Sequence, residues 1–280
     1  MAYRKDINIT KDIPPFRKIL NSLTPSRNAA IIYFTQTLDI TNTEIWMQGY
    51  QESTGRKINF LHLYVTIVGR EFYKHPRLNR YVTGNRFYQR DGVTISVSAK
   101  KKKENGGKIV LLKLPVFAQD TVDAVQDRFL KMLGEGRDQE EIYQEKETRL
   151  FSKLPGFVLR GALRLIRLLD KFHLLPGFFV DPDPLYSSIV VANLGSVGLD
   201  AAYHHLYEYG NCPFFAVIGK TYETVVVKDG KTEIRKFVDI KYSFDERVED
   251  GLACGYGLAA LQRMIENPEL LFAESKAEAA

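Results

Sequence analysis

The chain has 280 residues, of which 45% are hydrophobic and 26% charged, and its formal net charge at pH 7 is +5. This composition is typical of a globular protein and excludes a disordered or collagen-like chain. No apolar run reaches the roughly 18 residues that cross a bilayer, so no transmembrane helix is expected. Part of the positive excess lies in residues 100–103, directly before Glu-Asn-Gly-Gly. That context favours a solvated hairpin loop, and we expect no nucleic-acid partner.

The hydrophobic pattern predicts strands and helices in an irregular order along the chain. Strand-like sequences, rich in β-branched and aromatic residues, lie at 29–40, 86–90, 92–100, 108–117, 190–194, 214–219, 224–228 and 232–244. Asp229-Gly230 is a hairpin turn signal between the last two. Thr41 or Asn42 is expected to cap a helix after the first strand. Further helices are expected at 58–73, 123–149 and about 251–265.

No linker, repeat or composition break divides the chain, so residues 1–280 are expected to form a single domain with a frayed tail at 274–280. Helices mixed with a sheet whose strands are largely joined by hairpins indicate an α+β fold. We expect a two-layer sandwich in which helices cover one face of a mixed, largely antiparallel sheet.

Residues 150–179 form an apolar and basic stretch bracketed by Leu-Pro-Gly at both ends. Spacings of four, three and four place Arg160, Arg164, Arg167 and Lys171 on one stripe of a helix. The stretch is interpreted as a helix packed on the body with its charges in water. An alternative is a helix that lies on a membrane surface or covers an apolar channel, which would make the protein membrane-peripheral.

Two cysteines in a chain of this length do not form a disulfide framework, and they favour a reducing, cytoplasmic setting. Cys254 is expected to face the core as a small hydrophobic residue, whereas Cys212 is the one thiol that merits labelling. The histidines lack the paired spacing of metal ligands, so no metal site is expected.

Two windows resemble a known family. Residues 237–251, FVDIKYSFDERVEDG, resemble the DHRxxDG signature of the dihydrolipoyl acyltransferase catalytic domain, whose counterpart in chloramphenicol acetyltransferase is HHxxxDG. Residues 190–198, VVANLGSVG, resemble the SNLGxxG strand and turn of the same superfamily. A looser match, in the order expected, lies at residues 38–41 and 75–79. The chain is therefore similar to the chloramphenicol acetyltransferase-like superfamily.

The resemblance implies a homotrimer whose active sites lie in channels between subunits. An acyl thioester of the coenzyme A type and its acceptor would enter from opposite ends, and no cofactor would be bound covalently. It also implies that Asp250, followed by Gly251, pairs with an arginine and fixes the loop. Arg17, 233 positions away, is the expected partner in a buried or half-buried pair, with Arg27 as the next candidate, and Asn193 is a further structural residue at the site.

Two positions depart from the pattern. Glu246 stands where the family has its histidine base, and Ala192 stands where it has the serine or threonine that stabilises the oxyanion. A carboxylate with a reference pKa of about 4.3 is a poor base for a thiol or alcohol, and alanine donates no hydrogen bond. The inherited mechanism therefore cannot operate unchanged.

Residues 201–215, which include Tyr207 and Cys212, are expected to line the channel. Ala192 is expected to line it as well. His204 and His205 are adjacent, so in an extended segment they should point to opposite sides. Either one is a candidate replacement base, oriented by Glu208 or Glu246. The alternative is that both are ordinary channel or interface residues.

Two functions follow. The first is an acyltransferase that uses a thioester, with His205 or His204 as base and Glu246 in support. The second is a non-catalytic trimeric scaffold or binding protein that keeps the acyltransferase fold.

Overall fold

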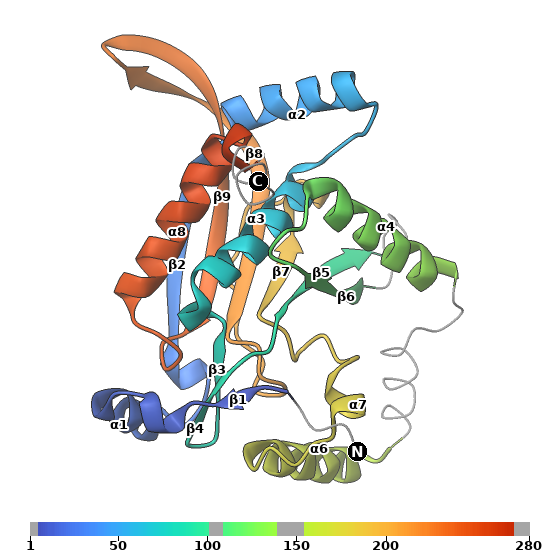
Figure 1. The fold of residues 1–280 in the computed structure, drawn as a ribbon, viewed down its shortest axis with the longest axis vertical. Coiled ribbons are helices and arrows are strands. Elements are labelled where there is room, and N and C mark those ends of the chain that lie inside the picture. The colour runs from blue at the N-terminus through green and yellow to red at the C-terminus, as the bar shows by residue number, and fades with distance from the viewer. Residues whose placement is uncertain (1–4, 101–108, 139–153, 272–280) are drawn as a thin grey trace.

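The structure is a computed structural model that describes residues 5–100, 109–138 and 154–271. Its centre is a six-stranded sheet in the order β2-β9-β8-β7-β5-β6 (Figure 1). The strands are β2 (Ile31–Asp39), β5 (Val93–Lys100), β6 (Ile109–Val116), β7 (Ile189–Asn193), β8 (Phe214–Lys228) and β9 (Lys231–Asp245). β7 runs parallel to both β5 and β8, whereas the β2–β9, β8–β9 and β5–β6 pairs are antiparallel. The sheet is therefore mixed and largely antiparallel, as expected.

Three helices pack against this sheet: α3 (Phe60–Lys74), α4 (Val122–Asp138) and α8 (Gly251–Glu266). α3 contacts both of the others and is buried along most of its length. It begins where the Asn59 side chain accepts a hydrogen bond from the His62 amide at 3.0 Å, and it ends before His75-Pro76. The core between the layers includes the fully buried side chains of Leu38, Ile67, Ile95, Leu114, Ile240 and Ile265. This confirms the predicted two-layer α+β architecture.

A small second sheet with the order β1-β4-β3 lies below the main one, beside helix α1 (Pro15–Leu23) (Figure 1). Its strands are β1 (Ile7–Asn8), β3 (Arg80–Thr83) and β4 (Arg86–Gln89). Short 3₁₀ turns lie at Thr10–Asp12, Asn28–Ala30, Pro76–Leu78 and Gly195–Val197. The sequence pattern did not predict α1, which is short, begins at a proline pair and exposes one apolar edge.

The structure corrects two details. Neither Thr41 nor Asn42 caps α2 (Thr41–Thr54); instead the Asp39 carboxylate accepts from the Thr41 amide at 3.0 Å. The sequences at 214–219 and 224–228 belong to one continuous strand, β8, because a register irregularity between Ile218 and Thr221 interrupts the apolar pattern without ending the pairing.

The hairpin turn between β8 and β9 is at Asp229 and Gly230, as predicted, and both residues have positive φ. The outer half of this hairpin projects beyond the sheet (Figure 1). The stretch at 150–179 contains α6 (Gly156–Lys171) and α7 (Gly177–Val180), while residues 150–153, 139–149 and the tail lie outside the described residues. Within the described ranges, no helix is long and apolar enough to cross a bilayer.

Candidate functional site

The loop between β9 and α8 carries the signature residues, and the N-terminal part of the chain holds it in place. The Glu246 amide donates to the Ala30 carbonyl at 2.9 Å, and Arg17 Nη1 lies 3.4 Å from the Glu246 carbonyl. Asp250 caps α8 by accepting from the Ala253 amide at 2.9 Å. The backbone that presents the half-buried Glu246 side chain is thus fixed on both sides.

The carboxylate that anchors this loop is Glu249, which the sequence analysis missed. Its side chain is 1% exposed and binds Arg17 at 2.8 Å, Arg77 at 2.8 Å and Arg80 at 3.6 Å. The predicted contact between Arg17 and Asp250 exists at 3.3 Å, but the Asp250 side chain is 55% exposed. The Arg17–Asp250 contact is therefore present as predicted, but it is not the buried or half-buried pair that was expected, and Glu249 is the buried partner of Arg17. No local pattern distinguishes Glu249, because its arginines come from distant segments.

A second buried carboxylate, Asp245, lies at the end of β9. Arg247 binds it with two hydrogen bonds of 2.8 and 2.7 Å, and Arg27 Nε lies 3.8 Å from it. Burial lowers the pKa of Arg27, and the negative charge of Asp245 partly offsets that effect. Arg27 also donates to the backbone carbonyls of Tyr207 and Gly210. This joins the signature loop to the segment that contains the histidines.

The two histidines do not point to opposite sides, contrary to expectation. Their rings stack with centroids 4.5 Å apart, and the His204 ring also stacks on Phe215 at 4.0 Å. His204 Nδ1 donates to the His205 carbonyl at 2.6 Å, which holds the ring over its neighbour. Desolvation lowers the pKa of the half-buried His204, whereas His205 is exposed. His205 packs edge-on against Tyr207, also on the surface, at 5.2 Å.

The carboxylate expected to orient a histidine is occupied elsewhere. Glu208 accepts from the Asn28 amide at 3.0 Å, from its side-chain amide at 2.8 Å and from the Arg27 amide at 3.3 Å. Burial alone would raise the pKa of Glu208, but these hydrogen bonds outweigh it and hold the pKa below its ordinary value. Among the described contacts, none joins Glu208 or Glu246 to either histidine ring. One chain does not assemble the predicted base and its orienting group.

Ala192 and Asn193 lie at the end of β7. The Asn193 side chain accepts from the Ser196 amide at 3.1 Å and so shapes the following turn. Gly195 is required there, since a Cβ would lie 2.3 Å from the Gly219 carbonyl oxygen. Ala192 pairs with Val217, which pairs with Lys241.

Glu246 comes five positions after Lys241 in the chain, which corresponds to about 16 Å along an extended strand. The positions that correspond to the family's base and oxyanion donor are therefore well separated within one chain. A site that uses both positions must therefore combine Ala192 of one copy of the chain with Glu246 of another.

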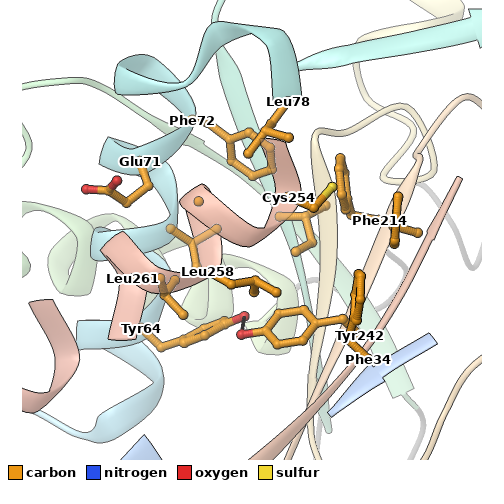
Figure 2. A pocket seen from close by; sticks show the side chains of 14 residues that line it. Phe34, Tyr64, Glu71, Phe72, Leu78, Phe214, Tyr242, Cys254, Leu258 and Leu261 are labelled. Atoms are coloured by element: carbon orange, nitrogen blue, oxygen red, sulfur yellow. Dashed lines mark hydrogen bonds between the residues drawn. The ribbon is translucent and has the colours of Figure 1, made fainter. Parts of the chain in front are cut away.

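The thiols are buried. Cys212 is 6% exposed and donates to the Phe214 carbonyl at 3.3 Å, so in one chain it lies in the core and not on an open channel. Cys254 faces the core, as expected, and burial raises its pKa to about 12. It lines an apolar cavity of about 80 Å³ between α3, α8 and the sheet (Figure 2). On one wall of this cavity, Tyr64 donates to the Tyr242 hydroxyl at 3.2 Å.

Within the described ranges, no group of three or more histidine, cysteine, aspartate or glutamate side chains is placed to hold a metal ion.

The overall fold is similar to that of chloramphenicol acetyltransferase and of dihydrolipoamide acetyltransferase catalytic cores, and the strand–loop–helix signature lies between β9 and α8. Residues 184–273 match the family described as 2-oxoacid dehydrogenases acyltransferase (catalytic domain). The resemblance found in the sequence is thereby confirmed for this part of the chain.

Two curated relatives align with shorter segments. The lipoamide acyltransferase component of the branched-chain alpha-keto acid dehydrogenase complex of Pseudomonas putida is 32% identical over 90 residues, 31% of this chain. The dihydrolipoyllysine-residue succinyltransferase component of the 2-oxoglutarate dehydrogenase complex of Rickettsia conorii is 43% identical over 63 residues, 22% of this chain. The aligned segments span 20% and 16% of the lengths of these relatives.

Solved structures show the fold over nearly the whole chain. A probable dihydrolipoamide acetyltransferase from Listeria monocytogenes has a TM-score of 0.61 at 14% identity, covering 91% of this chain and 92% of its own. A chloramphenicol acetyltransferase has a TM-score of 0.55 at 14% identity, covering 94% and 98%.

The dihydrolipoamide acetyltransferase of Azotobacter vinelandii has a TM-score of 0.57 at 17% identity, covering 92% and 87%. That structure addresses the roles of a serine, a histidine and an asparagine in its catalytic mechanism. At identities this low, the likeness shows the fold.

Proposed function

We propose that this protein transfers an acyl group from a thioester of the coenzyme A type to an acceptor, in a channel between subunits of a homotrimer. The observation that carries the proposal is the tightly held Glu246 loop, placed about 16 Å along the strands from Ala192. A loop held in this way preserves the shape of a site, and its separation from the β7 end calls for a second copy to complete that site.

In this mechanism, His205 or His204 takes the proton from the attacking thiol or hydroxyl of the acceptor. The nucleophile adds to the thioester carbonyl carbon, and the tetrahedral intermediate then expels the thiolate, which recovers the proton from the imidazolium. Desolvation keeps His204 neutral near pH 7, and the exposed His205 is free to meet a ligand. Glu246 from a neighbouring copy orients the imidazole. Tyr207 is the candidate hydroxyl donor to the oxyanion, since Ala192 has none.

The test is release of coenzyme A from a panel of acyl thioesters incubated with acceptors. His205→Ala or His204→Ala should lower the rate by about 10²-fold or more if that ring is the base. His75→Ala, a change at the far end of α3, is the matched control and should leave the rate unchanged. Release that is undiminished in both the His204 and His205 variants would remove their assigned roles.

The trimer is tested separately by mass. Light scattering on the purified chain should give about 96 kDa, three times the 32.0 kDa of one chain. A monomer at working concentrations would contradict an intersubunit site, because the positions of Ala192 and Glu246 would then remain apart.

A second candidate is a non-catalytic trimeric scaffold that binds a thioester. The observation that favours it is the lack of any described contact between Glu246 and either histidine, together with the loss of the donor at Ala192. Calorimetry with an acyl thioester would then show binding without release of the thiol. Any measurable turnover would exclude this candidate.

The proposal also places the protein in the cytoplasm, with α6 in contact with a membrane surface. Phe157, Leu165 and Phe172 are exposed by 72%, 56% and 51% along one edge of α6. Basic side chains follow the neighbouring edge, which is the arrangement of interfacial helices on anionic lipids. Co-sedimentation with phosphatidylglycerol vesicles should fall when Phe157 and Leu165 are both replaced by serine. Unchanged binding would contradict insertion of this edge.

A further inference from the structure

A polar pocket of about 570 Å³ lies between α1, the turn that joins β3 to β4, and α6. The same pocket reaches the residues that connect the signature loop with the histidine segment. Its lining includes the hydroxyl of Thr83, two carboxylates and five cations: Asp170, Glu208, Arg27, Arg164, Arg167, Lys171 and Arg247.

At the back of this pocket, two cations are balanced by two carboxylates. Arg27 and Arg247 share the buried carboxylate of Asp245, and Glu208 beside Arg27 supplies the second negative charge. Glu208, which also lines the pocket, already accepts three hydrogen bonds from Arg27 and Asn28. With the buried Asp170 of α6 also in the lining, the five cations of the pocket exceed the three nearby carboxylates by two, and that excess lies on α6.

The front of the pocket is formed by cations that are available to a ligand. Arg164, Arg167 and Lys171 are exposed, and in the described part of the chain no ion pair or hydrogen bond engages their charged groups. Spacings of three and four put them on one edge of α6. α6 is seated against the turn after β3, since a Cβ on Gly84 would lie 2.7 Å from Lys171 Cγ. The edge is thus held over the pocket.

One buried hydroxyl on the pocket wall also lacks a partner. Thr83 is 7% exposed, and its Oγ1 has no hydrogen-bond partner among the described residues. A buried hydroxyl without a partner is costly to the free protein. A ligand oxygen that reached this wall would satisfy it.

We infer that this pocket binds the phosphate group of a phosphorylated ligand. Three available cations at the front, a net positive charge of the lining as a whole and a spare hydroxyl donor suit an anion with several charges and several acceptor oxygens, and a phosphate or diphosphate has both. The inference rests on the pocket alone and not on acyl transfer, so the two fail separately. The phosphate is either that of a free small molecule or that of an anionic lipid headgroup.

The first arm of the test is calorimetric titration of the full chain with inorganic pyrophosphate at low ionic strength. Arg164→Gln and Lys171→Gln should each weaken binding about tenfold, which corresponds to one charge-assisted hydrogen bond. Thr83→Val, which keeps the shape of the side chain, should weaken it about threefold. Arg160→Gln is the matched control, because it removes the same charge from α6 outside the lining of this pocket.

The second arm measures co-sedimentation with phosphatidylglycerol vesicles for the same variants. Pyrophosphate binding that responds to Arg164 and not to Arg160 identifies a free phosphorylated ligand. Vesicle binding with that same dependence, without pyrophosphate binding, identifies a lipid headgroup. Binding that Arg160→Gln and Arg164→Gln weaken equally would overturn the pocket in favour of diffuse attraction, and so would binding of neither probe. Thermal unfolding of each variant confirms that it is folded.

Discussion

The arginines around the signature loop are paired with buried carboxylates, whereas those along α6 are exposed and have no such partners in the described ranges. Arg17 and Arg77 converge on Glu249, and Arg247 is bound to Asp245 by two hydrogen bonds. Arg164 and Arg167 on α6 face the pocket without such partners in the described ranges. A buried carboxylate must be compensated, so the first set maintains the shape of the loop. An exposed cation needs no partner and is free to meet a ligand.

The largest effect on stability is expected at Glu249. Glu249→Ala removes the shared partner of Arg17, Arg77 and Arg80 and leaves their charges close together. We expect the free energy of unfolding to fall by about 3–5 kcal/mol, as for a buried ion pair that loses one side. Urea denaturation of the variant and the parent measures this. A loss below about 1 kcal/mol would show that water reaches the carboxylate.

His62 is a buried titratable group without a charged partner, unlike Glu249, and it should make the stability of the protein depend on pH. Both of its ring nitrogens are buried without hydrogen-bond partners in the described part of the chain, and burial lowers its pKa to about 4. Between pH 6.5 and 4 the unfolded chain binds a proton that the folded chain does not, so stability falls as the pH falls. At about 1.4 kcal/mol per pH unit, the loss reaches about 3 kcal/mol near pH 4.

Denaturation curves at pH 7, 6 and 5 measure this slope for the parent and for His62→Leu, in which the part due to the histidine should vanish. An unaltered slope in His62→Leu would mean that other groups carry the pH dependence.

Arg17 contacts one buried carboxylate, Glu249, and one exposed carboxylate, Asp250. Asp250→Ala removes the cap of α8 and should cost about 1 kcal/mol. In double-mutant cycles with Arg17→Ala, Glu249→Ala should show the larger coupling energy and Asp250→Ala a value within about 0.5 kcal/mol of additivity. Equal coupling energies in the two cycles would mean that the exposed Asp250 stabilises the protein through Arg17 as much as the buried Glu249 does.

The smallest effect is expected on α6. Arg164→Gln should change the free energy of unfolding by no more than about 0.5 kcal/mol, because it removes an exposed charge that has no described partner. Thermal unfolding checks this, with Arg160→Gln as the reference. A larger destabilisation would show that Arg164 holds the helix in place and is not reserved for a ligand.

The local features of this protein follow from short stretches of its sequence. The apolar spacing at 58–73 predicted α3, Asp229-Gly230 predicted the hairpin turn, and residues 237–251 predicted a strand, a loop and a helix in that order. Each of these depends on neighbours within a few positions, where periodicity and turn chemistry act directly.

Only the tertiary structure decided which charges and rings meet. Arg17 was expected to pair with Asp250 in the loop. The fold brings it to both carboxylates, but its shorter contact is with the buried Glu249, 232 positions away. His204 and His205 were expected on opposite sides, but Phe215 provides a surface on which the rings stack. The separation of Ala192 from Glu246 depends on the register of three strands. Local propensity sets a helix or a turn, whereas a buried carboxylate or an apolar ring selects its partners from whatever the packed chain places within a few ångströms.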